Sequence, residues 1–151
     1  MSHEHVVTAV HRSGMHFEAE VGPHTVQMDY PMVPDAAGAG PRPLEMLLAS
    51  LACCAGGSLV FLFRRAGQAF ESLRVTARGR RRSEHPTVFT DIRLEFAVRG
   101  SLTLAAAEAA VKEAEERFCP VWAMLRFATS IEASVRVEGW KEAEWSPTRA
   151  T

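Results

Sequence analysis

The sequence predicts an α+β fold, and three features of its pattern lead to that prediction. Alternating apolar and polar residues, typical of half-buried strands, occur near the start, in the middle and near the end of the chain. Two longer stretches between them carry apolar residues at helical spacing. With 151 residues the chain can bury one sizeable core, so we expect a single domain over residues 1–151, with flexible tails at 1–5 and 141–151.

The first part of the chain predicts an antiparallel meander of three strands. Residues 15–21 and 26–30 alternate between apolar and polar side chains, and Gly22-Pro23 supplies the turn between them. Residues 6–10 precede these segments with a similar composition. A loop rich in Pro, Gly and Ala over residues 31–43 then leads to a helix.

The longest apolar stretch, residues 44–63, predicts a helix with Pro43 in its first turn and Arg64 and Arg65 in its last. Its length is close to that of a membrane span. A glutamate, two serines and two glycines interrupt it, however, so a buried core helix is the favoured interpretation. Because a helix that is apolar on nearly all sides needs protein around it, we expect a partner subunit to cover part of it.

The second half of the chain predicts a hairpin, two helices and a last strand. The alternating segments are residues 73–77 and 88–98, joined by the loop 80–86, and residues 131–137. The helices are expected over residues 104–118, capped by Thr103, and from Pro120 to about 128. Residues 139–151 form a polar tail that carries Trp140 and Trp145.

Composition and charge narrow the class of protein. A hydrophobic content of 47% with 23% charged residues is typical of a soluble globular protein. A formal net charge of -1 gives no overall attraction to nucleic acid or anionic lipid. The start of the chain lacks the pattern of a signal peptide, and three cysteines is an odd number. We therefore expect a cytoplasmic protein whose thiols are free or redox-active.

The adjacent pair Cys53 and Cys54 lies inside the apolar helical stretch. One interpretation is structural, with both residues acting as small apolar side chains that let neighbouring elements approach. The other is chemical, with one thiol facing a site. Neighbouring positions on a helix point about 100° apart, so only one of the two is expected to face a given site, and the pair is a poor disulfide candidate.

Cys119 lies where one predicted helix ends and Pro120 can begin the next. A thiol at such an N-cap experiences the positive end of the helix dipole, which favours the thiolate. A buried cysteine at a helix junction is the structural alternative.

Two motifs resemble those of the OsmC/Ohr family, in its OsmC-like branch. The first is the helix start Gly40-Pro41-Arg42-Pro43-Leu44-Glu45, followed by a cysteine, Cys54, about two and a half turns later. The second is Cys119-Pro120-Val121, directly after the second long helix. His85-Pro86 and Gly100 also fit, and the resemblance extends over residues 14–137. It implies antiparallel sheets wrapped around two long central helices in an intertwined homodimer, with two active sites at the interface.

The resemblance also implies an activity, which is the thiol-dependent reduction of organic hydroperoxides in oxidative stress defence. Cys54 would attack the O–O bond and become a sulfenic acid, and Cys119 would condense with it to a disulfide. An external dithiol, carried by a lipoyl protein or a thioredoxin-like protein, would reduce that disulfide. No cofactor is implied.

At three positions the family's site residues do not transfer directly to this sequence. Cys53 is an additional thiol that could substitute for Cys54. The arginine that holds the thiolate in Ohr-type enzymes corresponds to Arg12, with Arg42 as a rival. Glu45 matches the family's acidic residue, yet nine residues place it opposite Cys54 on a straight helix, so it acts either in catalysis or as a first-turn carboxylate that favours the helix dipole.

Other features do not predict a site. Arginines at positions 74, 78 and 80–82 face Asp91 and Glu95 of the next strand without interleaved aromatic residues, which indicates a solvated hairpin face and no nucleic-acid surface. The histidines near the start have no metal-ligand spacing with the cysteines, so we expect no metal site. The competing functional hypothesis is a non-catalytic dimer of the same fold that binds an apolar small molecule in its interface cleft.

Overall fold

The structure, a computed structural model, describes residues 3–138 and confirms the α+β class. Its elements are β1 (Val7–Ser13), β2 (His16–Val21), β3 (His24–Met28), α1 (Pro43–Arg65), β4 (Phe70–Arg81), β5 (Phe89–Gly100), α2 (Leu104–Glu113), the π-helix η1 (Ala114–Phe118), α3 (Pro120–Leu125) and β6 (Ser130–Val137). The predicted polar tail, with Trp140 and Trp145, lies outside the described residues. Two compact units divide within α1, after Leu47, and the prediction of a single domain stays a prediction.

The amino-terminal unit contains the predicted meander. Its sheet has the order β1-β2-β3, and both pairs of strands are antiparallel. The register places Phe17 opposite Met28 and Ala19 opposite Val26, so apolar residues share one face and polar residues the other. Gly22 adopts a left-handed φ of 57° in the turn from β2 to β3, which explains a glycine at that position.

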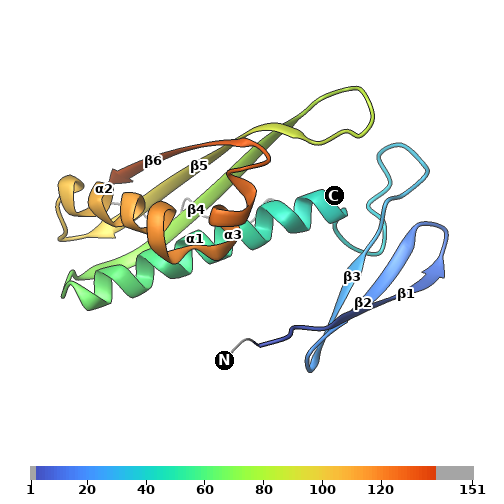
Figure 1. Cartoon of the computed structure of the whole chain (residues 1–151), viewed down its shortest axis with the longest axis horizontal. Coiled ribbons are helices and arrows are strands. Elements are labelled where there is room, and N and C mark those ends of the chain that lie inside the picture. The colour runs from blue at the N-terminus through green and yellow to red at the C-terminus, as the bar shows by residue number, and fades with distance from the viewer. Residues whose placement is uncertain (1–2, 139–151) are drawn as a thin grey trace. The chain divides into compact units, whose positions relative to one another are not determined.

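The second unit is built on the sheet β4-β5-β6, and here one prediction is wrong. The strands β4 and β5 pair antiparallel, as the hairpin pattern predicted, but β5 and β6 run parallel. The reason is the connection between them, because α2, η1 and α3 carry the chain back to the end of the sheet where β5 begins (Figure 1). The expected all-antiparallel arrangement is therefore replaced by a mixed sheet.

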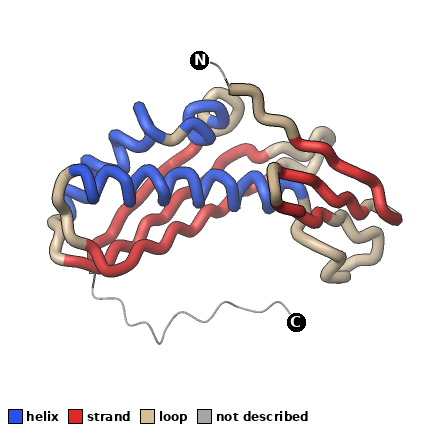
Figure 2. Tube along the Cα trace, turned by 90° about the horizontal axis from the view of Figure 1, so that it is seen from below, coloured by secondary structure: helices blue, strands red, loops and turns tan. Residues whose placement is uncertain are grey.

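The helices of this unit lie over one face of its sheet (Figure 2), and the buried residues of the sheet and the helices form its core. Every second residue of β5 points inward and is buried: Ile92, Leu94, Phe96 and Val98. The inward side of α1 contributes Leu51, Ala55, Leu59 and Leu62, and α2 contributes Ala107 and Ala110. At Gly56 a Cβ atom would come within 3.0 Å of Val75 on β4, so the glycine lets helix and sheet pack closely.

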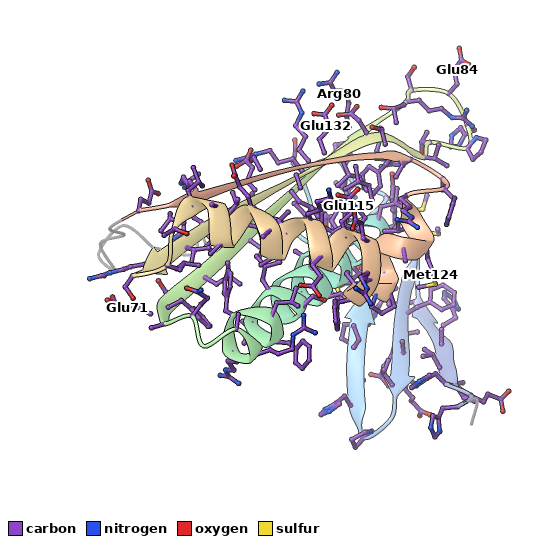
Figure 3. All side chains as sticks on the ribbon, turned by 60° about the vertical axis from the view of Figure 1, so that its left-hand side comes forward. Glu71, Arg80, Glu84, Glu115, Met124 and Glu132 are labelled. Carbon is purple, nitrogen blue, oxygen red and sulfur yellow. The ribbon has the colours of Figure 1, made fainter. Side chains whose placement is uncertain are left out.

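The outer face of the sheet is charged, as the sequence predicted. Arg78 pairs with Glu95 at 3.3 Å and Arg80 with Asp91 at 3.6 Å, and all four side chains are at least partly exposed. The side chains of Arg80 and Glu132 project from the sheet on the side away from the helices (Figure 3). Exposed ion pairs of this kind contribute little stability. Their position on the outer face of the hairpin is that of the solvated, charged surface which the pattern of charges predicted.

By length and composition, helix α1 could cross a membrane. Within the chain, 33% of the most apolar 18-residue stretch of this helix is buried. The buried positions follow one stripe, while Phe61 on another side is 51% exposed. The burial expected on all sides is therefore incomplete in one chain. Covering of the remaining surface by a partner subunit stays a prediction.

The second predicted helix, over residues 104–118 with Thr103 as its N-cap, forms, but its last five residues are not α-helical. The α-helical hydrogen bonds of α2 end at Glu113, and residues 114–118 continue as the π-helix η1. The amide of Cys119 donates to the carbonyl of Ala114 at 2.9 Å, which is the five-residue spacing of a π-helix. The described residues thus contain the long helix α1 and a second helical segment that changes to π-helical hydrogen bonds before Cys119, and the two long helices at the centre of a homodimer stay a prediction.

Candidate active site

The fold brings two thiols together that lie 65 positions apart in the sequence. The Sγ atoms of Cys54 and Cys119 are 3.0 Å apart, and both cysteines are free. Cys54 is half-buried, whereas Cys119 is only 2% exposed. Both residues belong to the second unit, so the pair is formed within one chain and one compact unit.

Cys119 is held at a junction of two helices, as the sequence predicted. It is the N-cap of α3, with φ -92° and ψ 101°, and Pro120 occupies the first helical position. The backbone N–H of Trp122 donates to its Sγ at 3.4 Å. The π-helix before Cys119 adds one residue to the preceding turn, and π-helices of this kind are frequent at functional sites.

Cys54 is presented by α1, and its neighbour Cys53 points elsewhere. Cys53 is exposed, while Cys54 contacts Cys119. This difference confirms that only one of two adjacent helical thiols faces a given partner. The hydroxyl of Ser58 donates to the backbone carbonyl of Cys54 at 2.9 Å and leaves the sulfur to Cys119.

The environments of the two thiols make them chemically unequal. Burial, and then the hydrogen bond to Cys54, raise the pKa of Cys119 to about 12. Cys119 therefore keeps its proton at neutral pH and donates it to the sulfur of Cys54. The N–H groups at the start of α3 lower the pKa of Cys119, as expected at a helix N-cap, but desolvation outweighs them, so the structural alternative of a buried, protonated cysteine describes its protonation state.

The raised pKa of Cys119 predicts a pH dependence of stability. Above about pH 9 the thiol ionises in the unfolded chain but keeps its proton in the folded chain, so the folded state binds more protons. The contribution is complete below about pH 9, and the free energy of unfolding falls as pH rises towards 12, by up to about 1.4 kcal/mol per pH unit. Urea unfolding at about pH 8 and about pH 10.5 should show a steeper fall for the natural chain than for Cys119→Ala. Equal slopes would contradict the assignment.

An open pocket of about 420 Å³ adjoins Cys54. It is lined by Cys54, Gly57, Ser58, Phe61 and Phe118 and is mostly apolar. The rings of Phe61 and Phe118 are 5.5 Å apart. A pocket of this kind accepts an alkyl or aryl group next to the half-buried thiol.

Sequence reasoning missed the wall of this pocket. Phe61 follows Cys54 by seven positions, two helical turns, so the spacing along α1 was a usable signal for it. Phe118 comes from another element, and only the fold reveals that it stacks near Phe61. The guanidinium of Arg65 lies over both rings, at 5.7 Å and 5.0 Å, and pairs with Glu113 at 2.6 Å, which ties α1 to α2.

Trp122, three residues after Cys119, is a core residue. It is fully buried and is not among the residues that line the pocket. Its indole N–H makes no hydrogen bond within residues 3–138.

Two further predicted site residues lie in the amino-terminal unit. Arg12 forms an ion pair with Glu18 on the polar face of the sheet, and hydrogen bonds from Gln27 and then Arg12 lower the pKa of Glu18. Glu45 accepts the backbone N–H of Arg42 at 2.9 Å, which is half of a capping box at the start of α1. The geometry thus gives Glu45 a structural role, and catalytic roles for Arg12 and Glu45 stay predictions.

Comparisons with known proteins show which family and fold this chain shares. A family model described as OsmC-like protein matches residues 36–134. Protein YhfA of Escherichia coli strain K12 is 35% identical over 98 residues, which cover 64% of this chain and 73% of that protein. A hypothetical protein from Aquifex aeolicus VF5 has a TM-score of 0.82 at 24% identity, over 93% of this chain and 100% of that one. An organic hydroperoxide resistance protein OsmC from Legionella pneumophila has a TM-score of 0.71 at 20% identity, over 89% and 98%.

Proposed function

The chain belongs to the OsmC-like protein family, and from this premise we propose that it reduces organic hydroperoxides with the thiol pair Cys54 and Cys119. The observation that carries the proposal is the 3.0 Å separation of their sulfurs beside an open apolar pocket. A relative of the same fold, from Legionella pneumophila, is named an organic hydroperoxide resistance protein.

Cys54 is the residue that attacks the peroxide, because it is the half-buried thiol of the pair and lines the pocket. Its sulfur, as the thiolate, forms a bond to the distal oxygen while the O–O bond breaks. The leaving alkoxide takes a proton and departs as the alcohol. The sulfur is oxidised to a sulfenic acid, and the peroxide is reduced.

Cys119 is the resolving residue, because its raised pKa keeps it a thiol until the first step is complete. Its sulfur then bonds to that of Cys54, the sulfenic hydroxyl leaves, and the thiol proton leaves with it as water. The sulfurs need to approach by about one ångström from 3.0 Å to reach disulfide bonding distance. An external dithiol, on a lipoyl protein or a thioredoxin-like protein, reduces the disulfide and restores both thiols.

The proposal includes the setting of the enzyme. It acts as a homodimer in the cytoplasm, in defence against oxidative stress, without a metal or cofactor. The incompletely covered apolar surface of α1 supports a partner subunit. Arg12, or its rival Arg42, is the cation proposed to hold the thiolate, and Glu45 is proposed to assist it.

The direct test is to identify the sulfurs that become oxidised. After one equivalent of cumene hydroperoxide, mass spectrometry of the alkylated and digested protein should find a Cys54–Cys119 disulfide and free Cys53, because only the first two sulfurs are in contact. Free thiols at both Cys54 and Cys119, with the peroxide unconsumed, would refute the proposal. A disulfide involving Cys53 would reassign the pair.

The same pocket supports one other candidate function. Because it is open and mostly apolar, it suits a non-catalytic module that binds an apolar small molecule. In that case neither Cys54→Ser nor Cys119→Ser alters peroxide consumption, and apolar ligands raise the melting temperature.

A further inference from the structure

The Cys54–Cys119 pair is also a preformed arrangement of two soft ligands. Both sulfurs are free, and they are 3.0 Å apart before anything binds. Thiols select soft, thiophilic elements over hard cations. Within residues 3–138, no group of three or more His, Cys, Asp and Glu side chains could hold a metal ion. Among the described residues, an atom bound here therefore receives its two ligands from Cys54 and Cys119, and it brings its further substituents with it.

The separation of the sulfurs discriminates between bonding geometries. With a bond to sulfur of about 2.3 Å, a linear two-coordinate ion would hold two sulfurs about 4.6 Å apart. A pyramidal atom with bond angles near 90° would hold them about 3.2 Å apart with the same bond length. The observed 3.0 Å matches the pyramidal geometry, which is that of trivalent arsenic. We propose that this pair is a chelating site for a monosubstituted trivalent arsenical.

The pocket indicates what the third substituent on arsenic is. Arsenic bonded to Cys54 lies at the pocket that Phe61 and Phe118 line. An aryl or alkyl group on arsenic fills this mostly apolar space. A hydroxyl group of inorganic arsenite would give up its hydrogen bonds to water there and gain no apolar contacts in return. The site therefore prefers organoarsenicals to arsenite, and aryl groups to methyl.

The binding reaction involves no change of oxidation state. An arsine oxide R–As=O reacts with the two thiols, two S–H bonds and the As=O bond break, two As–S bonds form, and one water leaves. Arsenic remains trivalent. The reaction therefore proceeds on the reduced protein whether or not it reduces peroxides.

The experiment uses reduced full-length protein and phenylarsine oxide, followed by intact-mass spectrometry in the presence of excess glutathione. The natural chain should retain one phenylarsenic group with the loss of two thiol protons. Cys54→Ser and Cys119→Ser should each lose it, with affinity lower by about 10²–10⁴-fold, because a single thiol lacks the advantage of chelation. Cys53→Ser is the matched control and should retain it, and 2,3-dimercaptopropanol should remove it. Retention by Cys119→Ser, or displacement by glutathione alone, would overturn the proposal.

A second comparison tests the pocket. Phenylarsine oxide should bind more tightly than methylarsine oxide, and arsenite least, and Phe61→Ala should reduce the preference for phenyl. Phe61 is 51% exposed within one chain, and circular dichroism verifies that Phe61→Ala retains the fold. Equal affinity for all three compounds would refute the role of the pocket. The arsenical experiment contains no peroxide, so it tests chelation independently of the proposed peroxidase activity. Failure to bind phenylarsine oxide would not contradict the disulfide expected with cumene hydroperoxide, and the reverse also holds.

Discussion

Replacing Cys54 by serine is expected to reduce peroxide consumption to the uncatalysed background, a loss on the order of 10³-fold or more, as when other enzymes lose their nucleophile. Cys54 is the thiol that both lines the pocket and contacts Cys119. A hydroxyl in its place is far less nucleophilic than a thiolate. The measurement is the rate of cumene hydroperoxide loss with a dithiol reductant, at several enzyme concentrations.

Cys53→Ser is the matched control for this variant, because it changes the adjacent residue in the same way on the same helix. Cys53 is exposed and free, whereas the sulfur of Cys54 is in contact with that of Cys119. Its replacement should leave the rate within about twofold, as is usual for exposed positions. The reverse result, loss of activity in Cys53→Ser alone, would make the additional thiol the nucleophile.

Replacing Cys119 by serine is expected to have the second-largest effect, and a different one. The first turnover should survive, because Cys54 remains, but turnover with a dithiol should fall by at least about tenfold. The intramolecular thiol at 3.0 Å acts at a high effective concentration, and removing it leaves the sulfenic acid to slower intermolecular reactions. Trapping with dimedone and mass spectrometry should show the Cys54 sulfenic acid in this variant and little in the natural chain.

The double variant Cys53→Ser/Cys119→Ser determines whether the neighbouring thiol takes over resolution. Adjacent helical side chains are poorly placed for a disulfide, so the double and single variants should accumulate the same amount of dimedone adduct. Equal trapping in the natural chain and Cys119→Ser would contradict resolution by Cys119. If neither cysteine variant affected peroxide loss while apolar ligands raised the melting temperature, the binding module would be the better description.

Local patterns in the sequence predicted most of the fold. The sequence predicted β2 and β5 from their alternating apolar and polar residues, and α1 from its long apolar stretch. Both signals depend only on residues close together in the chain. The predictions failed where the outcome depends on distant contacts. The direction of β6 follows from the path of the connection before it, and the π-helix η1 interrupts a segment whose apolar spacing is that of an ordinary helix.

For the candidate site too, features that depend on adjacent residues were predictable from the sequence, and features that depend on distant contacts were not. The sequence predicted the two cysteine motifs and the N-cap position of Cys119, because these depend on residues adjacent in the chain. The wall formed by Phe61 and Phe118 and the raised pKa of Cys119 were not, because each arises from groups that only packing brings together.

The sequence by itself thus determined which elements form, which family the chain resembles and which thiols are candidates. The tertiary structure decided that Cys54 and Cys119 meet while Cys53 is exposed, and that burial raises the pKa of Cys119. The physical reason is that periodicity and capping act over a few residues. Desolvation and contact between sulfurs depend instead on how elements 65 residues apart pack against each other.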